Sequence, residues 1–349
     1  MARTKNATVV PTEHEADPVL GEEEEDLPRE DPGKEPEDYE EAEQNSMDSE
    51  DETEPLRPLK MYFSPSDYVK PFKLSSKCYI HQAVKLLRGH LSVGELKWFL
   101  EHPQFKHFFH MHTGSNHKLM GMWMLLLRTA CLDKKKECWF VVNGVPIRYS
   151  IQEFALSSGL FCHSYPKNYE AIGSDMFSGK HFGATGTVTY ARVKDKLLSM
   201  KRSNPDRLKM AVLYLLCSVI VGKRKTGPLA DPVEDLFLRA VEDLEWCKTF
   251  PWGRFAFEHN MKDIFHLLDH FDGGLGAQWV FPSFVMPLEI LAFEAIPNLM
   301  NQFREHVVSA DPECPRMCKM KFKPSSMKGF PMSELYDSLG TTMYNYAAI

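Results

Sequence analysis

Histidines are concentrated in one stretch of the sequence: His102, His107, His110, His112 and His117. A spacing of three residues, as between His107 and His110, places two imidazoles on one face of a helix, where they could bind a metal ion. Phenylalanines alternate with these histidines, as expected of an amphipathic helix, and no cysteine or carboxylate set completes a group of ligands. The pattern therefore favours histidines that face solvent or pack singly, and we predict no metal site.

The eight cysteines are scattered along the chain and form no catalytic pattern. Six of them lie mostly in apolar stretches, where cysteine acts as a small hydrophobic residue: Cys78, Cys131, Cys138, Cys162, Cys217 and Cys247. Cys314 and Cys318 are four residues apart, but no second pair lies near them to complete a zinc site. Glycine patterns typical of phosphate or dinucleotide binding are absent as well. The sequence therefore predicts no enzyme, no cofactor and no small-molecule substrate.

The net charge of −7 is divided unevenly along the chain. Residues 1–56 contain 21 acidic and 4 basic residues, a net charge of −17, whereas the remaining residues contain 27 acidic and 37 basic ones, a net charge of +10. The first segment has almost nothing to bury, so we predict a disordered acidic tail. The basic remainder could bind a polyanion such as nucleic acid, with the tail competing for the same cations, or the tail could only improve solubility.

Nine basic residues are the candidate phosphate contacts: Lys201, Arg202, Arg207, Lys223, Arg224, Lys225, Lys319, Lys321 and Lys323. A solvated surface charge is the default for each of them. Clustering on one face of the fold would favour nucleic acid, and dispersal would favour a scaffold that binds proteins. The cluster at 223–225 favours the nucleus over the cytoplasm, and scattered cysteines without a secretory signal favour an intracellular protein. The most apolar stretch, residues 208–221, is shorter than the roughly twenty residues that a membrane span needs, so we expect no membrane partner.

Residues 139–160 have the clearest local structure. They open with aromatic and β-branched residues, and Asn143-Gly144 follows, a pair that favours a two-residue hairpin turn. Ser150 and Glu153 have the capping-box spacing of a helix start, and Gly159 can end that helix in the left-handed conformation. The stretch predicts a β-hairpin joined directly to a short capped helix.

The rest of the chain alternates helical patterns with breaks. Apolar periodicity and capping residues predict helices over residues 77–87, 92–102, 104–111, 119–127, 188–200, 208–221, 231–244, 257–271 and 287–295. The helix at 231 is predicted from an Asp231 cap followed by Pro232. A short strand is predicted near 279–284. The polar, glycine-rich residues 163–186 are predicted to be one long loop, either mobile or placed over a groove.

The predicted fold class is mainly α (α+β). It comprises a disordered acidic tail over residues 1–56, a helical domain with a small β-hairpin over residues 57–310, and a basic C-terminal extension over residues 311–349.

Four strings resemble a plant domain family of unknown function: WFVVNGVPIRYSIQEFALSSGL, RLKMAVLYLLCSVIVG, VEDLEWCKTFPWGRFAFE and PLEILAFEAIP. They keep the expected order between residues 68 and 302, and their combination is more specific than any single string. In many plant proteins that domain precedes a Ulp-type (C48-like) cysteine protease domain, often in proteins derived from Mutator-like transposable elements. The resemblance implies a plant origin, a mostly helical domain and a transposon-related context. It implies no established activity.

The protease domain itself is not recognisable in this sequence, which contains neither a His-Trp pair nor an Asp-Cys-Gly string. The leading hypothesis is a non-catalytic, transposon-related interaction or scaffold domain with protein partners. One alternative is a nucleic-acid-binding module with a self-masking acidic tail. Another is a remnant of a Ulp-type SUMO protease protein that lacks its catalytic domain.

Overall fold

The computed structural model describes residues 60–68, 70, 72–112, 120–132, 135–183, 186–222, 230–271, 275–276, 278–323 and 332–339. The chain divides into two compact units, residues 1–56 and 57–349, and every described residue lies in the second. The predicted acidic tail therefore lies outside the described residues. The second unit is mainly α with a few short strands, which confirms the predicted fold class.

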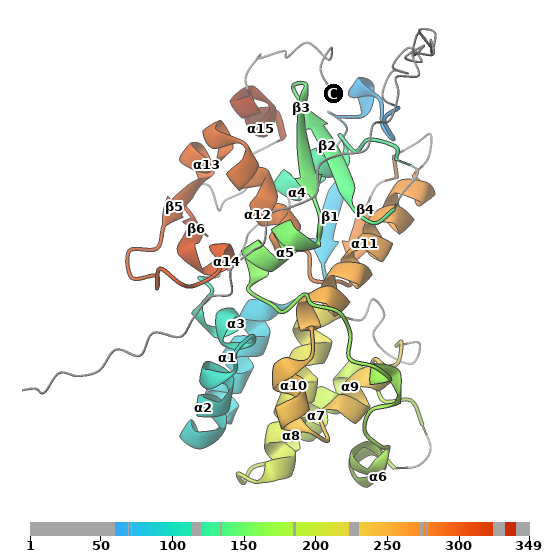
Figure 1. Cartoon of the computed structure of the whole chain (residues 1–349), viewed down its shortest axis with the longest axis vertical. Helices are drawn as coiled ribbons and strands as arrows, with labels where there is room; N and C mark the ends of the chain where they lie inside the picture. The colour runs from blue at the N-terminus through green and yellow to red at the C-terminus, as the bar shows by residue number, and fades with distance from the viewer. Residues whose placement is uncertain are drawn as a thin grey trace, which may run out of the picture. The chain divides into compact units, whose positions relative to one another are not determined.

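One group of helices is centred on α8 (Pro205–Leu215). The other members are α1 (Ile80–His90), α2 (Val93–Glu101), α3 (Lys106–His110), α6 (Met176–Phe182), α7 (Tyr190–Ser199), α9 (Asp235–Ala240) and α10 (Leu244–Thr249). They occupy the lower half of Figure 1. All residues from Met210 to Val221 are buried, so this apolar stretch is the centre of the group, as predicted. The α-helix ends at Leu215, however, and continues as a π-helical turn, Leu216–Ile220.

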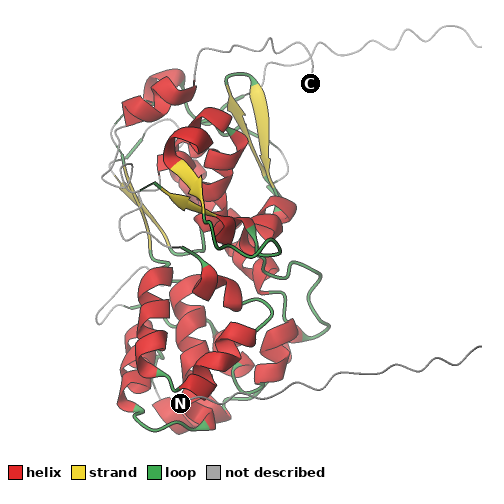
Figure 2. Cartoon of the chain, turned by 90° about the vertical axis from the view of Figure 1, so that its left-hand side faces the viewer, coloured by secondary structure: helices red, strands yellow, loops and turns green. Residues whose placement is uncertain are grey.

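A second group surrounds α12 (Met286–Ala295), whose residues 287–293 are all buried. Its other members are α4 (Met120–Leu126), α5 (Ile151–Ser158), α13 (Pro297–Phe303), α14 (Arg316–Lys319) and α15 (Met332–Leu339). The 19-residue α11 (Trp252–His270) contacts both α5 and the π-helical turn, so it joins the two groups (Figures 1 and 2). Within the described ranges, no helix combines the length and apolar character that crossing a membrane requires.

The strands of the described residues form three two-stranded sheets. They are β1 (Lys73–Ser76), β2 (Cys138–Val142), β3 (Val145–Tyr149), β4 (Gln278–Phe281), β5 (Arg304–His306) and β6 (Met320–Phe322). β1 pairs in parallel with β4, which lies at the strand predicted near residue 279. β5 and β6 are antiparallel. Because β6 belongs to the predicted C-terminal extension and β5 to the predicted helical domain, the two segments share one sheet, and the boundary at 310 stays a prediction.

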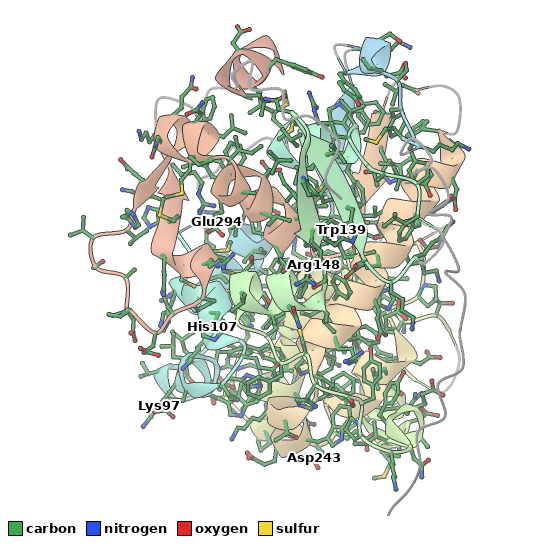
Figure 3. The ribbon with its side chains drawn as sticks, turned by 45° about the horizontal axis from the view of Figure 1, so that its top comes forward. Lys97, His107, Trp139, Arg148, Asp243 and Glu294 are labelled. Atoms are coloured by element: carbon green, nitrogen blue, oxygen red, sulfur yellow. The ribbon has the colours of Figure 1, made fainter. Side chains whose placement is uncertain are left out.

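The β2–β3 hairpin forms as predicted. Asn143 and Gly144 have φ angles of 49° and 81°, in the left-handed region that a two-residue hairpin turn requires. Trp139 lies opposite Arg148 across the two strands (Figure 3). At the end of β3, the buried hydroxyl of Tyr149 donates a hydrogen bond of 2.7 Å to a side-chain oxygen on α11, which anchors the hairpin to that helix.

The helix that follows the hairpin, α5, is capped as predicted. The Ser150 hydroxyl accepts the N–H of Gln152 at 3.2 Å, and the Glu153 carboxylate accepts the N–H of Ser150 at 2.9 Å. Gly159 ends the helix with φ 69°, and a Cβ at this position would come within 2.8 Å of His107.

The prediction of one long loop over residues 163–186 is wrong. The described part of this segment contains a 3-10 turn, Tyr169–Ala171, and the helix α6. Two phenylalanines of α6, Phe177 and Phe182, are buried in spite of the polar composition around them. Burial of these two side chains stabilises α6, and the local sequence pattern does not reveal that burial.

The predicted helix over residues 231–244 is also wrong in its bounds. Pro232 forms an isolated antiparallel bridge with Thr189, and the N–H of Val233 donates to the Val188 carbonyl at 2.8 Å. These contacts keep the segment extended, so α9 begins only at Asp235. The apolar helical pattern is interrupted again after α9. A separate helix, α10, begins there with Asp243 as its N-cap.

Candidate functional site

Four of the five clustered histidines are described, two of them exposed and two buried. His110 and His112 are exposed, whereas His102 and His107 are buried (His107 is labelled in Figure 3). Burial lowers the pKa of His102 to about 3 and that of His107 to about 4, so both are neutral at physiological pH. In the described part of the chain no group of three His, Cys, Asp or Glu side chains is placed to hold a metal ion. His117 lies outside the described residues.

The cysteine thiols are poorly suited to nucleophilic chemistry. Burial raises the pKa of Cys78, Cys162 and Cys318 to about 12, and it raises the pKa of Cys138 and Cys247 further. A catalytic cysteine needs the opposite, an environment that lowers its pKa and favours the thiolate.

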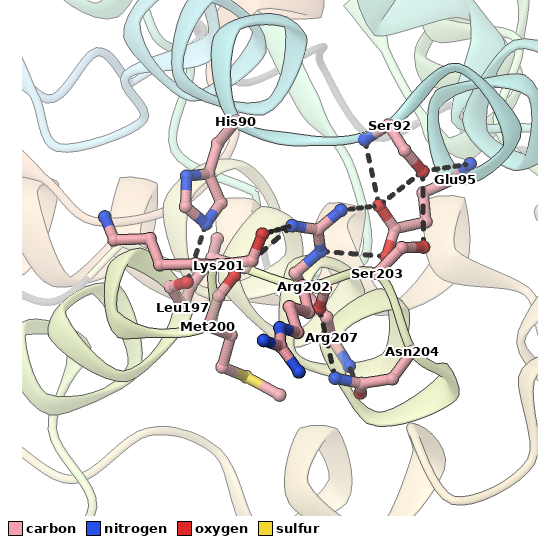
Figure 4. A network of polar contacts seen from close by, with 10 residues as sticks. All are labelled: His90, Ser92, Glu95, Leu197, Met200, Lys201, Arg202, Ser203, Asn204 and Arg207. Carbon is pink, nitrogen blue, oxygen red and sulfur yellow. Dashed lines mark hydrogen bonds and ion pairs between the residues drawn. The ribbon is translucent and has the colours of Figure 1, made fainter.

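Arg207, one of the predicted phosphate contacts, is buried and used within the fold. Its Nε and Nη2 donate to the two carboxylate oxygens of Glu95. Its Nη1 donates to the carbonyls of Met200 and Lys201 at 3.3 and 2.9 Å (Figure 4). A guanidinium with these partners is not available to a phosphate.

Lys201 and Arg202 lie in the loop between α7 and α8, and both are exposed. The predicted contacts Lys223, Arg224 and Lys225 lie outside the described residues.

The remaining three candidates lie in the other group of helices, at the end of α14 and in or just after β6 (Figure 1). Lys319, Lys321 and Lys323 are half-buried. The Nζ of Lys321 lies 3.1 Å from the Glu305 carboxylate, and Lys323 donates to the Asn301 carbonyl at 2.6 Å. The described candidates are therefore dispersed over two groups of helices and do not form one cluster.

A groove of about 480 Å³ lies between α6, the segment after α6 and the start of α9; we call it the α6–α9 groove. It is lined by Asp175, Ser178, Gly179, Gly183, Gly186, Thr187, Val188, Pro232, Val233, Asp235 and Leu238. A Cβ added to Gly179 or Gly183 would meet no atom within 4 Å. The glycines therefore face open space, and side chains at these positions would narrow the groove.

Two contacts hold α6 beside α9 and fix the walls of the groove. Gly173 lies so close to α9 that a Cβ would come within 2.5 Å of the Arg239 carbonyl oxygen. The Glu242 carboxylate accepts the N–H of Phe177 at 2.9 Å and the hydroxyl of Ser174 at 2.6 Å. Because Phe177 is in the first turn of α6, where backbone N–H groups have no partner within the helix, Glu242 caps α6 from a distant part of the chain.

The α6–α9 groove carries negative charge. Asp175 and Asp235 are exposed, and no lysine or arginine of the described residues forms an ion pair with either. Three nearby cations already have partners. Arg192 borders the groove at Gly186, and its guanidinium donates to the carbonyls of Thr187 and Phe182. Lys180 lies 2.5 Å from Asp206, and Arg239 donates to two backbone carbonyls of the segment before α6. These two carboxylates are therefore able to accept a cationic group.

The sequence suggested a groove under residues 163–186 but did not predict the elements that line this one. Of its eleven lining residues, five lie in the segment predicted as a long loop and four lie in the helix predicted over residues 231–244, whose start is wrong. Thr187 and Val188 lie outside both segments. The sequence did contain one signal for the groove. Gly179, Gly183 and Gly186 are three to four residues apart, which places them on one side of a helix and of the segment that follows it.

Comparison with known proteins places these features in a plant context. Residues 126–263, which include the whole lining of the α6–α9 groove, match the family model described as a domain of unknown function (DUF1985). The chain is 46% identical over 295 residues to the uncharacterized protein At3g43530 of Arabidopsis thaliana, and the alignment covers 84% of this chain and 35% of the relative. No solved structure matches the chain. The chain therefore spans about a third of its plant relative, and its central part is similar to a domain family of unknown function, as the sequence resemblance implied.

Proposed function

We propose that this chain is a non-catalytic interaction domain whose α6–α9 groove binds an extended segment of a partner protein carrying a lysine or arginine. The observation that carries this proposal is the pair of carboxylates without ion-pair partners, Asp175 and Asp235. They line the same groove as three apolar side chains, Val188, Val233 and Leu238. Apolar contacts would supply affinity, and the carboxylates would select the positive charge.

The shape of the groove supports a peptide rather than a compact metabolite. Its volume falls within the range of about 300 to 1,000 Å³ that small-molecule sites occupy, but such sites bury most of their ligand. Ten of the eleven residues that line this groove are exposed or half-buried, so a bound ligand would keep contact with solvent. Glycine in its walls lets a main chain approach closely, as extended-peptide binding requires.

The chemistry of the lining supports binding without catalysis. The groove contains no histidine or cysteine, and Ser178 donates its hydroxyl to the Asp175 carbonyl and has no base beside it. The buried neutral histidines and protonated thiols described above lie outside the lining. No nucleophile with an activating base is therefore presented to a bound ligand.

We extend the proposal to longer proteins such as the Arabidopsis relative. There, a domain of this kind would hold a partner in place for activities carried elsewhere on the polypeptide. The association with a Ulp-type protease, the transposon origin and the nuclear location belong to this proposal. They rest on the sequence resemblance and on the basic cluster at 223–225.

The test uses the full chain and a fluorescent heptapeptide of alternating valine and lysine that carries a photo-crosslinker. We expect cross-links to map to α6 and α9. We also expect binding to weaken at least tenfold, about 1.4 kcal/mol, in Asp175→Asn/Asp235→Asn and in Gly179→Leu, which fills the groove.

The matched control is Asp195→Asn/Glu313→Gln, which removes two exposed carboxylates from other elements. It should bind the peptide within twofold of the unaltered chain, and a heptapeptide with glutamate in place of lysine should not bind. Unchanged affinity of both groove variants would refute the proposal. It would mean that the peptide binds outside the groove, for example to the acidic residues 1–56, which are the same in every variant.

A further inference from the structure

Helix α1 exposes a face that contains basic residues and no acidic ones. Its buried positions are Ile80, Ala83, Val84 and Leu87. Its exposed positions are His81, Gln82, Lys85, Arg88 and Gly89. With about 100° of rotation per residue, these exposed positions occupy one continuous arc opposite the buried one. The whole helix, IHQAVKLLRGH, has no aspartate or glutamate.

Helix α3 adjoins one side of this arc. Arg88 Nη2 donates to the Phe109 carbonyl at 3.0 Å, and the guanidinium lies 5.5 Å from the centre of the Phe109 ring. Lys106 and His110 are four residues apart and so lie on the same side of α3. This helix, KHFFH, also lacks acidic residues.

The loop between α7 and α8 lies beside the C-terminal end of α1 (Figure 4). The His90 Nε2 lies 2.8 Å from the Leu197 carbonyl oxygen at the end of α7. The hydroxyl oxygens of Ser92 and Ser203 are 3.3 Å apart. These contacts bring the exposed Lys201 and Arg202 to the C-terminal end of α1, and residues 199–204 contain no acidic side chain.

Five basic residues lie on α1 or on the two elements that contact it, and we call them the α1 basic face: Lys85, Arg88, Lys106, Lys201 and Arg202. None of the five forms an ion pair with a described residue. Among the nearest carboxylates by sequence, Glu95 binds Arg207, Glu101 lies 3.6 Å from Lys97 and Asp206 lies 2.5 Å from Lys180, whereas Asp195 on α7 is exposed. The charge of the face is therefore left for an external anion.

We infer that the α1 basic face binds the phosphate backbone of nucleic acid. Protein partners usually bring aromatic or aliphatic anchors to an interface core, and they need apolar surface to receive them. The exposed positions of α1 offer none. Exposed cationic side chains on a helix face that exposes no apolar residue are the surface that a phosphate backbone fits.

The dimensions of the face agree with binding to a nucleic-acid backbone. Eleven residues of α-helix extend about 16 Å, which matches several phosphates of one strand at roughly 3.4 Å of rise each. A Cβ added to Gly89 would meet no atom within 4 Å, although glycine inside a helix costs about 1 kcal/mol relative to alanine. Packing therefore does not explain this glycine, whereas a phosphate that approaches the helix closely would use the space.

The experiment measures fluorescence anisotropy of a labelled 20-base-pair DNA duplex and of a single-stranded 20-mer with the full chain. The variants are Lys85→Glu/Arg88→Glu and Lys201→Glu/Arg202→Glu. The matched control is Lys319→Glu/Lys321→Glu, which changes the net charge equally but lies at β6. We expect each face variant to weaken binding at least tenfold and the control to weaken it less than twofold. The slope of the salt dependence of duplex binding should fall by about 0.9 for each phosphate that a variant no longer neutralises.

Three results would overturn the inference: no binding by the unaltered chain at 50 mM salt, equal weakening in the face and control variants, or tighter binding of polyglutamate than of DNA. The last would assign the face to an acidic protein. The neutral variant Lys85→Gln/Arg88→Gln, checked for unchanged helix content, separates the removal of positive charge from misfolding. Because the face shares no residue with the α6–α9 groove, its failure would leave the peptide proposal intact.

Discussion

The guanidinium of Arg207 and the carboxylate of Glu95 bind each other through two hydrogen bonds, with both side chains buried. The same carboxylate accepts the N–H and the hydroxyl of Ser92 at 2.9 and 2.8 Å, so it also completes the capping box of α2. Arg207 in turn holds two carbonyls of the loop that carries Lys201. One ion pair therefore fixes the start of α2, the start of α8 and part of the α1 basic face.

This ion pair predicts a loss of stability at acidic pH. Although burial raises the pKa of the Glu95 carboxyl, the hydrogen bonds from Arg207 and Ser92 outweigh it and lower the pKa from 4.5 to about 2. A carboxyl whose pKa is lower in the folded state stabilises the fold above its unfolded pKa, and this contribution disappears as pH falls from about 4.5 to 2. Urea unfolding at pH 6 and pH 3 should show a larger loss for the unaltered chain than for Glu95→Gln. Equal losses would show that Glu95 does not control acid stability.

The hairpin and its capped helix predict two graded effects. Ser150→Ala should lower the free energy of unfolding by about 1 kcal/mol, because the cap of α5 is removed. Gly144→Val should cost more, because a β-branched residue resists the φ of 81° at this position. Thermal and urea unfolding measure both effects. Val145→Thr, an exposed change on the neighbouring strand, is the control. If Gly144→Val were as stable as the control, the turn geometry would be wrong.

The sequence predicted elements whose signals are local. The turn at Asn143-Gly144 and the caps at Ser92 and Ser150 depend on residues within a few positions, and all of them form as expected. The capping pattern at Asp231 is equally strong locally, yet it is not used. The bridge between Pro232 and Thr189 is a contact over about forty residues, and no local pattern reports it.

The α6–α9 groove could not be predicted for the same reason. Helix α6 has a polar sequence, and its first turn is capped by Glu242, more than sixty residues later in the chain. The basic residues show a related difficulty. Lysines and arginines can be counted in the sequence, but only the fold separates the buried Arg207 from the exposed Lys201 and Arg202.

Metal removal is predicted to have no effect. The two residues with the spacing of metal ligands are separated by the fold, because His107 is buried and neutral whereas His110 is exposed. Dialysis against EDTA should leave the melting temperature unchanged within error, and added zinc should not raise it. Stoichiometric zinc that survives dialysis and disappears in His107→Ala/His110→Ala would contradict this prediction.

The distant cap of α6 gives the last prediction, which connects stability with the proposed function. Glu242→Ala removes the acceptor of the Phe177 N–H and of the Ser174 hydroxyl, so α6 should detach from α9 more often. Amide hydrogen exchange should become faster in α6, and the valine–lysine heptapeptide should bind more weakly because the groove loses one wall. Glu245→Ala is the matched control, since its exposed carboxylate pairs with Lys248 on α10 and holds no other element. Faster exchange in α6 with unchanged peptide affinity would separate the helix from ligand binding and refute the α6–α9 groove as the peptide site.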